Sequence, residues 1–331
     1  NAFVKLGQFL QSDELKNSPI IDSAVHKNAW YTKPNILQQI HAIAQNLTHD
    51  QLEKWLKDVP NQDIDKSVGL VLAGNLPLVG FHDIMCVLLA GFTAKIKVSS
   101  DDAGLTKFIL DQLIEIEPQF AKKIQLLDKL ENFDLVIATG SNNSARYFEY
   151  YFGKKPNIIR KNRNSLSVLS GNETKEQLQA LGHDIFDYFG LGCRSVSKIF
   201  IPEGYDIAKL LDNLESFHSI KDHSKYNNNY DFNKSIYLIN KNKHFDNGFL
   251  LLKEDESLAS PLAVVHFEYY KAKEDVEKYI LAHKEDIQCV TSDMDLQVAD
   301  VPVFPFGASQ YPALDDYADN VNTLDFLLAN Q

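Results

Sequence analysis

Short apolar runs alternate with stretches of helical periodicity between residues 67 and 153. The runs at 67–75, 93–100 and 133–141 have the length of buried strands and end in the small or polar sequences AGN, KVSS and ATGS. The stretches that follow predict helices at 78–92, 102–116 and 142–153. Strands that alternate with helices in this way form a parallel sheet covered on both faces. We therefore expect an α/β fold, whose ligands bind beyond the carboxyl ends of the strands.

A second alternation follows and predicts a further α/β lobe. A strand is expected at 165–171, a helix at 174–190 and a strand at 195–202. The remaining expected elements are strands over KSIYLIN, FLLLKE, PLAVVHFEYY and IQCVTSD and a helix over EDVEKYILAHKEDI. The polar stretch 218–234 predicts a solvated loop, with a lid that grips a ligand as the alternative. Residues 1–60 have mostly helical periodicity, and a length of 331 residues favours two lobes over one.

The composition argues against several classes of function. A net charge of −12 without a concentrated basic stripe argues against nucleic acid as a partner. No apolar run reaches the length of a membrane span and the N-terminal sequence lacks the layout of a signal peptide, so we expect a cytoplasmic protein without an integral membrane segment. Three cysteines without pairwise spacing indicate neither a disulfide framework nor a zinc site. The scattered histidines form no metal-binding motif, so we expect no bound metal.

One of the three cysteines differs from the others in its surroundings. Cys86 falls within an apolar helix and Cys289 within an expected strand, where each would fill space in a core. Cys193 instead follows Gly-Leu-Gly and precedes Arg194, so the glycines leave room at the sulfur and the cation favours the thiolate. Cys193 is therefore a candidate nucleophile, with an inert thiol as the alternative.

A nucleophile that attacks a carbonyl needs hydrogen-bond donors for the oxyanion. These donors are usually a side-chain amide and a backbone N–H. The sequence LAGNLPL offers Asn75 at the end of an expected strand. Taken by itself, the motif favours the alternative, which is an asparagine that only forms a turn.

Five motifs in order resemble those of the aldehyde dehydrogenase superfamily. AGNLP, KIKVSSDD, ATGS, GLGC followed by SKIFIP, and VFPFGAS span about residues 68–310. They are similar to the family's Asn-Phe-Pro turn, Lys-Pro-Ser strand end, Phe-Thr-Gly-Ser turn, Gly-Gln-x-Cys loop and Pro-Phe-Gly-Gly segment. The short chain and this version of the motifs most resemble the acyl-CoA reductase family, whose best-known members make long-chain aldehyde for bacterial luciferase.

The resemblance implies an aldehyde dehydrogenase-like α/β fold with two lobes. Residues 1–163 would form the N-terminal helices and a Rossmann-like cofactor lobe, and residues 164–310 the α/β catalytic lobe. Residues 311–331 would return to the cofactor lobe or make a dimer contact. The resemblance also implies that Cys193 is the nucleophile and that Asn75 and the Cys193 backbone N–H bind the oxyanion. The cofactor-binding positions that it implies are Lys97, Ser99, Ser100, Gly140 and Ser141.

The implied cofactor is a nicotinamide dinucleotide. The family position that usually places an acidic residue on the ribose hydroxyls is Ser100 here. A carboxylate would repel a 2′-phosphate, whereas a serine can donate a hydrogen bond to it, and Lys95 or Lys97 could add positive charge. The sequence therefore favours NADPH over NADH.

Two departures from the superfamily pattern concern carboxylates. Ordinary aldehyde dehydrogenases carry a glutamate that activates water to hydrolyse the thioester, but the matching stretch IIRKNRNSLSV contains no carboxylate and places Arg160 near that position. An acyl-enzyme without a hydrolytic base survives long enough to exchange with another thiol. The carboxylate that usually binds the nicotinamide ribose has a weak counterpart in Glu256, one residue out of register.

The resemblance therefore implies NADPH-dependent reduction of a long-chain fatty acyl-CoA, or a related acyl thioester, to the aldehyde. The reaction would pass through a thioester on Cys193, with CoA as the leaving group. Three alternatives stay open: a hydrolytic aldehyde dehydrogenase, a reductase of acyl phosphates of the glutamyl-phosphate type, and a non-catalytic subunit of an acyl-transfer complex. We also expect a homo-oligomer and consider an acyl-transferring partner protein.

Overall fold

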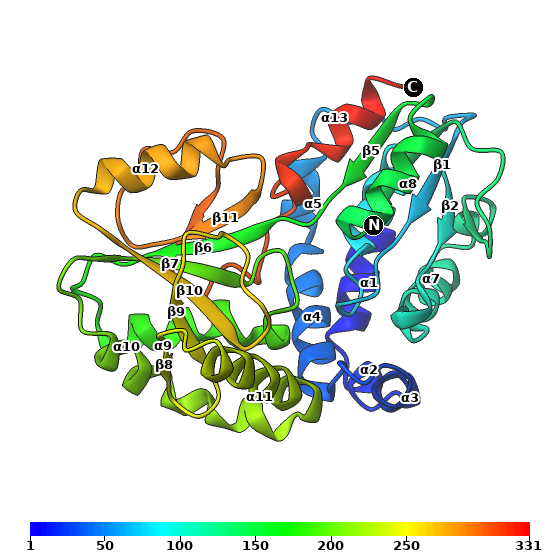
Figure 1. Cartoon of the computed structure of the whole chain (residues 1–331). Coiled ribbons are helices and arrows are strands. Elements are labelled where there is room, and N and C mark those ends of the chain that lie inside the picture. Colours follow the sequence, from blue (N-terminus) through cyan, green and yellow to red (C-terminus); the bar gives the residue numbers. More distant parts are fainter. The chain divides into compact units, whose positions relative to one another are not determined.

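The computed structural model describes residues 1–331 and divides into two compact units (Figure 1). The first contains residues 1–162, 312–317 and 321–331, and the second contains residues 163–311 and 318–320. Each unit has its own sheet with helices between the strands, which confirms the predicted α/β fold class. The assignment of cofactor binding to one part of the chain and of catalysis to another stays a prediction. No helix combines the length and the apolar character that crossing a bilayer requires.

The first unit contains a parallel five-stranded sheet in the order β3-β2-β1-β4-β5. Its strands are β1 (Ser67–Val71), β2 (Thr93–Lys97), β3 (Ile124–Leu126), β4 (Leu135–Thr139) and β5 (Asn157–Arg160). Successive strands move outward from β1 to β3, and the chain then returns to the other side of β1 to form β4. The boundary between β1 and β4 is therefore a topological switch point, where sheets of this kind bind ligands beyond the carboxyl ends of the strands.

Most helices of the first unit begin at a residue whose side chain accepts a hydrogen bond from the first turn. Thr32 and Thr48, for example, accept from the backbone N–H groups of Asn35 and Gln51, which satisfies donors that a helix start leaves unpaired. The helical periodicity predicted for residues 1–60 is confirmed. The helices are α1 (Ala2–Leu10), α2 (Asp13–Lys16), α3 (Pro19–Lys27), α4 (Lys33–Asn46), α5 (His49–Trp55), α6 (Phe81–Leu89), α7 (Leu105–Ile116), α8 (Asn142–Phe152) and α13 (Thr323–Leu328).

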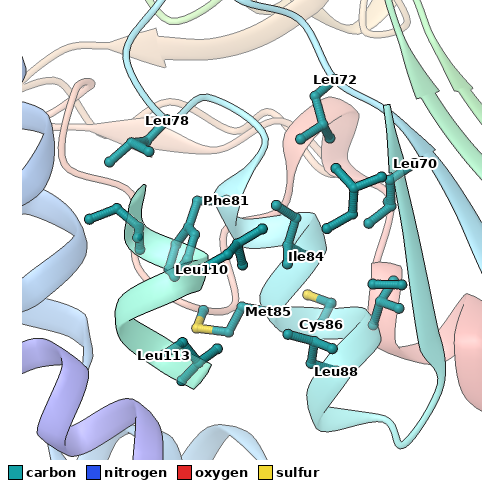
Figure 2. Close-up of a cluster of buried hydrophobic side chains, with 14 of the residues drawn as sticks. Leu70, Leu72, Leu78, Phe81, Ile84, Met85, Cys86, Leu88, Leu110 and Leu113 are labelled. Atoms are coloured by element: carbon teal, nitrogen blue, oxygen red, sulfur yellow. The ribbon is translucent and has the colours of Figure 1, made fainter. Parts of the chain in front are cut away.

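Cys86 lies in the main apolar core of the first unit. Figure 2 shows its thiol on α6 among apolar side chains such as Ile84 and Leu88, with Leu70 of β1 nearby. Cys86 is completely buried, and this burial raises the pKa of its thiol well above the usual range. The prediction that Cys86 fills space in a core is therefore confirmed.

The second unit contains a seven-stranded sheet in the order β12-β11-β6-β7-β10-β9-β8. All neighbouring strands are parallel except β8 and β9, which are antiparallel. The strands are β6 (Asn164–Val168), β7 (Val196–Pro202), β8 (Phe245–Asp246), β9 (Leu251–Glu254), β10 (Val264–Tyr270), β11 (Ile287–Thr291) and β12 (Val303–Phe304). The helices are α9 (Lys175–Phe186), α10 (Ile207–Leu214), α11 (Ser224–Ile239) and α12 (Lys273–Ala282). Cys289 is buried in β11, as predicted.

Two predictions for this unit are wrong. The stretch 218–234 is not a loop, because it belongs to the 3-10 helix Glu215–Asp222 and to α11. KSIYLIN is not a strand, because it forms the end of α11. The buried side chains of α11 are Tyr226, Tyr230, Asn233 and Tyr237, which recur three or four residues apart. The run of asparagines between Tyr226 and Tyr230 concealed the helical period. Burial of the tyrosine face then determined the helix in KSIYLIN, overriding a β-like local composition.

Candidate active site

The turn after β1 is tightly packed against the turn after β2. Gly74 has no room for a side chain, because a Cβ atom there would lie 2.8 Å from both Ser99 Cβ and the Asp102 backbone nitrogen. Its carbonyl accepts hydrogen bonds from Tyr31 Oη at 3.0 Å and from Asn28 Nδ2 at 3.4 Å. These contacts fix the backbone that leads into Asn75, whose side chain is exposed at the carboxyl end of β1.

The predicted adenosine-binding residues lie at the carboxyl end of the neighbouring strand β2. Lys97 is the exposed last residue of β2, and Ser99 begins a short 3-10 helix (Ser100–Asp102) by accepting a hydrogen bond from the Asp101 backbone N–H at 3.2 Å. Ser100 is also exposed. Lys95, by contrast, donates to the carbonyl of Asn132, which precedes β4 and lies toward the amino ends of the strands. Of the two lysines, Lys97 is therefore the one at the ligand-binding edge.

Asp101 is a feature of this edge that the sequence analysis missed. It follows Ser100 directly and is exposed. A carboxylate there could accept hydrogen bonds from ribose hydroxyls, which would favour NADH and oppose the effect of Lys97. The position of Asp101 directly after Ser100 in the motif KVSSDD could have identified it as a candidate ribose ligand.

Gly140 and Ser141 connect β4 to α8, on the other side of the switch point. A Cβ atom on Gly140 would lie 2.8 Å from Ser144 Cβ and 2.9 Å from the Phe148 ring, so a larger residue would displace the start of α8. Ser141 begins the helix and accepts a hydrogen bond from the Ser144 backbone N–H at 3.2 Å. The start of such a helix presents backbone N–H groups and a positive dipole end, which suit a pyrophosphate.

The sheet therefore gathers most of the predicted site residues of the first unit. Because β2, β1 and β4 are adjacent and parallel, their carboxyl ends lie along one edge. That edge carries an amide, an ammonium group, hydroxyls and a helix N-terminus at a switch point, a donor set that fits a dinucleotide. The residues along it are Asn75, Lys97, Ser99, Ser100, Gly140 and Ser141.

Cys193 lies in the second unit, in an exposed loop between α9 and β7. Three successive residues ahead of it adopt the left-handed backbone conformation: Tyr188 (φ 54°), Phe189 (φ 61°) and Gly190 (φ 76°). Glycine adopts this conformation freely, whereas for each aromatic residue it costs about 1–2 kcal/mol. Packing offsets this cost, because Tyr188 is buried and the Phe189 ring stacks on His223 with centroids 4.0 Å apart. The surrounding aromatic residues therefore determine the path of the chain into Gly-Leu-Gly-Cys.

Asp184 on α9 fixes the segment that contains the PFG motif. Its buried carboxylate accepts hydrogen bonds from the Gly307 N–H at 2.7 Å, the Ser309 N–H at 3.1 Å and the Ser309 hydroxyl at 2.7 Å. Burial raises the pKa of Asp184 to about 6, while the three donated hydrogen bonds act in the opposite direction. No role was predicted for Asp184, although a carboxylate among the apolar positions of α9 was a visible signal.

Arg160 is a structural residue of the first unit. Its guanidinium group forms a buried ion pair with Asp83 of α6 and donates a hydrogen bond to Thr323 Oγ1 of α13 at 2.9 Å. These contacts connect β5 with two helices. The side chain near the position of the superfamily's hydrolytic glutamate is therefore engaged in the core.

Glu256 is exposed in the turn between β9 and β10, and a buried lysine fixes its backbone. Lys198 of β7 is completely buried and donates to the carbonyls of Asp255 at 3.0 Å and Glu256 at 2.8 Å. The same ammonium group pairs with Glu268 Oε2 at 2.8 Å. Sequence reasoning missed Lys198, because its acceptors come from distant parts of the chain. Nowhere in residues 1–331 are three or more His, Cys, Asp or Glu side chains grouped so that they could bind a metal.

Comparison with solved structures confirms the fold. Aldehyde dehydrogenase 21 from Physcomitrella patens, solved with succinate, superposes with a TM-score of 0.71 at 12% identity, over 99% of this chain and 83% of its own. An acetylating aldehyde dehydrogenase from Geobacillus thermoglucosidasius gives 0.65 at 11% identity, over 98% and 89%. An aldehyde dehydrogenase from Bacillus cereus, solved with NAD+, gives 0.67 at 13% identity, over 92% and 75%. At these identities the likeness concerns the fold alone.

Comparison of the sequence with curated proteins gave no match. The model of the acyl-CoA reductase (LuxC) family, however, matches residues 29–292, which cover most of the chain and include Asn75 and Cys193. The resemblance seen in the five motifs is thereby confirmed, and the chain belongs to the acyl-CoA reductase (LuxC) family within the aldehyde dehydrogenase fold.

Proposed function

We propose that this protein is an oxidoreductase that reduces a long-chain fatty acyl-CoA, or a related acyl thioester, to the aldehyde. The observation that carries the proposal is the exposed Cys193 in a loop whose path is fixed by buried aromatic residues, in a chain of the acyl-CoA reductase family. An exposed thiol at the end of a glycine-containing turn is accessible to an acyl carbonyl. The buried Cys86 and Cys289 lack this access.

In the proposed reaction, the Cys193 thiolate attacks the thioester carbonyl and forms a new carbon–sulfur bond. The Cys193 N–H stabilises the oxyanion by about 3–4 kcal/mol, and the family resemblance assigns the second donor to Asn75. The carbonyl re-forms as the carbon–sulfur bond to CoA breaks, and CoA leaves as a thiolate. When bound, the nicotinamide cofactor supplies the hydride that reduces the enzyme thioester. The resulting thiohemiacetal anion on Cys193 collapses to the aldehyde as its carbon–sulfur bond breaks, which regenerates the Cys193 thiolate.

The residues near Arg160 support reduction over hydrolysis. The stretch from Ile158 to Val168 contains no carboxylate, and the guanidinium group of Arg160 is paired with Asp83. Without a base to activate water, the thioester on Cys193 persists until hydride arrives.

The experiment that tests this function is intact-mass spectrometry of the protein mixed with palmitoyl-CoA in the absence of cofactor. We expect a palmitoyl mass on the protein, located at Cys193 by peptide mapping and discharged as aldehyde when NADPH is added. Shorter acyl-CoAs and acyl phosphates form the comparison series. An adduct only from acyl phosphates would favour the acyl-phosphate reductase, and free palmitate as the product would favour the hydrolytic enzyme. No adduct from any donor would favour the non-catalytic subunit.

We further propose NADPH as the cofactor, with Lys97 contacting its 2′-phosphate. Lys97→Ala is expected to raise KM for NADPH about tenfold and to change KM for NADH less than twofold, because only NADPH loses a charge-assisted hydrogen bond. Steady-state kinetics with both cofactors measures the split. Lys95→Ala is the matched control, since its ammonium group is bound by the Asn132 carbonyl. If Lys97→Ala changes KM equally for both cofactors, or if the wild type has a lower KM for NADH than for NADPH, the adenosine ribose would instead be assigned to Asp101.

A further inference from the structure

Ser165 of β6 contacts the nucleophile loop from inside the second unit. It is completely buried, and its hydroxyl donates a hydrogen bond to the Cys193 carbonyl at 2.9 Å. The same oxygen lies 3.1 Å from the sulfur of Cys289 on β11. Because the hydroxyl proton points to the carbonyl, the Cys289 S–H is the donor in the second contact. The Ser165 hydroxyl therefore connects the buried thiol of Cys289 to the carbonyl of Cys193.

The sheet is irregular on both sides of Ser165. In the β6–β7 pairing, Ser165 faces Val196 but Leu166 faces Lys198, so Ser197 is an extra residue on β7. In the β6–β11 pairing, Asn164 faces Ile287 but Leu166 faces Val290, so β11 also has one extra residue. Such bulges are enriched beside active sites, where they redirect a side chain.

Side chains at both bulges contact Ser165. Ser197 Oγ lies 3.3 Å from the Ser165 carbonyl and donates to the Leu258 carbonyl at 2.8 Å. Cys289, within the β11 irregularity, contacts the Ser165 hydroxyl. The Ser165 hydroxyl thus lies against a side chain of β11, and the Ser165 carbonyl lies against a side chain of β7.

We propose that Ser165 is a positioning residue for Cys193, holding its carbonyl so that the thiol and the backbone around it keep the orientation needed to attack an acyl carbonyl. This inference rests on the proposed nucleophilic role of Cys193. Cys193 belongs to a loop, and the hydrogen bond from a completely buried strand residue to its carbonyl restricts the orientation of its peptide group. A misplacement of about 1 Å in a reacting group can lower a rate about a hundredfold.

Ser167 provides a matched control on the same strand. It is also completely buried, and its hydroxyl donates to the Thr291 carbonyl of β11 at 3.1 Å. Ser165→Ala and Ser167→Ala therefore remove the same kind of hydrogen bond from β6, but only Ser165→Ala removes one to Cys193. A merely structural role predicts equal effects of the two changes.

The kinetic test measures NADPH-dependent reduction of palmitoyl-CoA by both variants. Ser165→Ala is expected to lower kcat between about tenfold and a hundredfold with KM for palmitoyl-CoA unchanged, whereas Ser167→Ala stays within about twofold of the wild type. Ser165→Thr keeps the hydroxyl, so its kcat is expected to lie closer to that of the wild type than to that of Ser165→Ala. If Ser165→Ala does not fold, Ser165→Cys, which keeps the size but donates weakly, is expected to show an intermediate loss. Equal kcat losses in Ser165→Ala and Ser167→Ala, or wild-type kcat in the Ser165→Cys variant, would overturn the inference.

A second readout needs no acyl substrate. In protein labelled with 13C at the cysteine carbonyls, Ser165→Ala is expected to shift the Cys193 carbonyl resonance and Ser167→Ala to leave it in place. An unshifted Cys193 resonance would overturn the contact itself. If the resonance shifts but the wild type accepts no acyl-CoA, the proposed function fails while the contact stands. If the wild type is acylated and Ser165→Ala retains its kcat, the positioning role fails while the proposed function stands.

Discussion

Cys193→Ala is expected to abolish acyl reduction, with kcat reduced on the order of 10⁴-fold or more. Without the sulfur no enzyme thioester forms, and hydride would have to attack the acyl-CoA directly. The exposed position of Cys193 predicts that the variant folds normally and binds NADPH with unchanged affinity. The decrease in reduced nicotinamide absorbance measures turnover, and cofactor fluorescence measures binding.

Cys289→Ser is the control for the loss of a thiol. It preserves a donor beside Ser165 and lies in the buried interior of β11, so we expect most of the activity to remain. Turnover near the wild-type value in Cys193→Ala would reject the nucleophile assignment. Loss of NADPH binding in that variant would instead indicate that the change disturbed the cofactor site.

Asp83→Ala is expected to destabilise the protein by about 3–5 kcal/mol, because it leaves the buried guanidinium group of Arg160 without its carboxylate. Only 4% of the Arg160 side chain and 6% of the Asp83 side chain are exposed, so water cannot replace the lost partner. Thr323 Oγ1 lies 2.9 Å from Arg160 and 3.4 Å from Asp83, so the anchoring of α13 should weaken as well. Urea unfolding followed by circular dichroism measures the change.

The double variant Asp83→Leu with Arg160→Met shows whether the lost stability comes from the unpaired charge on Arg160 or from the absence of the ion pair. Replacing both members with apolar residues of similar size is expected to recover most of the lost stability. Asp111→Ala, which removes an exposed ion pair with Lys107, should cost at most about 1 kcal/mol. A loss below that value for Asp83→Ala would show that the pair contributes little.

Local sequence was sufficient for the elements whose apolar period is undisturbed. The strands around SVGLV, TAKIK and LVIAT lie where their apolar runs predict them, and the helices between them follow the expected order. The small and polar residues after those strands could be assigned to one edge, because parallel strands place their carboxyl ends together. The family resemblance extended this to Cys193, since GLGC is a short continuous motif.

Local sequence failed where a helix buries polar side chains. In α11 the tyrosines and Asn233 form the buried face, and hydropathy alone does not distinguish them from the exposed asparagines around them. Tyr226 Oη donates to the Phe249 carbonyl and Tyr230 Oη to Asp246, so these two hydroxyls have acceptors in a later part of the chain. Burial of a polar group requires such a partner, and the sequence does not identify it.

The sequence by itself determined the α/β class, the edge at which Asn75, Lys97 and Gly140 lie, and the prediction of Cys193 as the nucleophile. Only the tertiary structure decided how the cysteine loop, the segment at Gly307 and the turn at Glu256 are held in place. Asp184 binds Gly307 and Ser309, Lys198 binds the turn at Glu256, and Ser165 binds the Cys193 carbonyl. The reason is physical: a repeating apolar period is encoded by neighbouring residues, whereas each of these hydrogen bonds joins groups that only folding brings together.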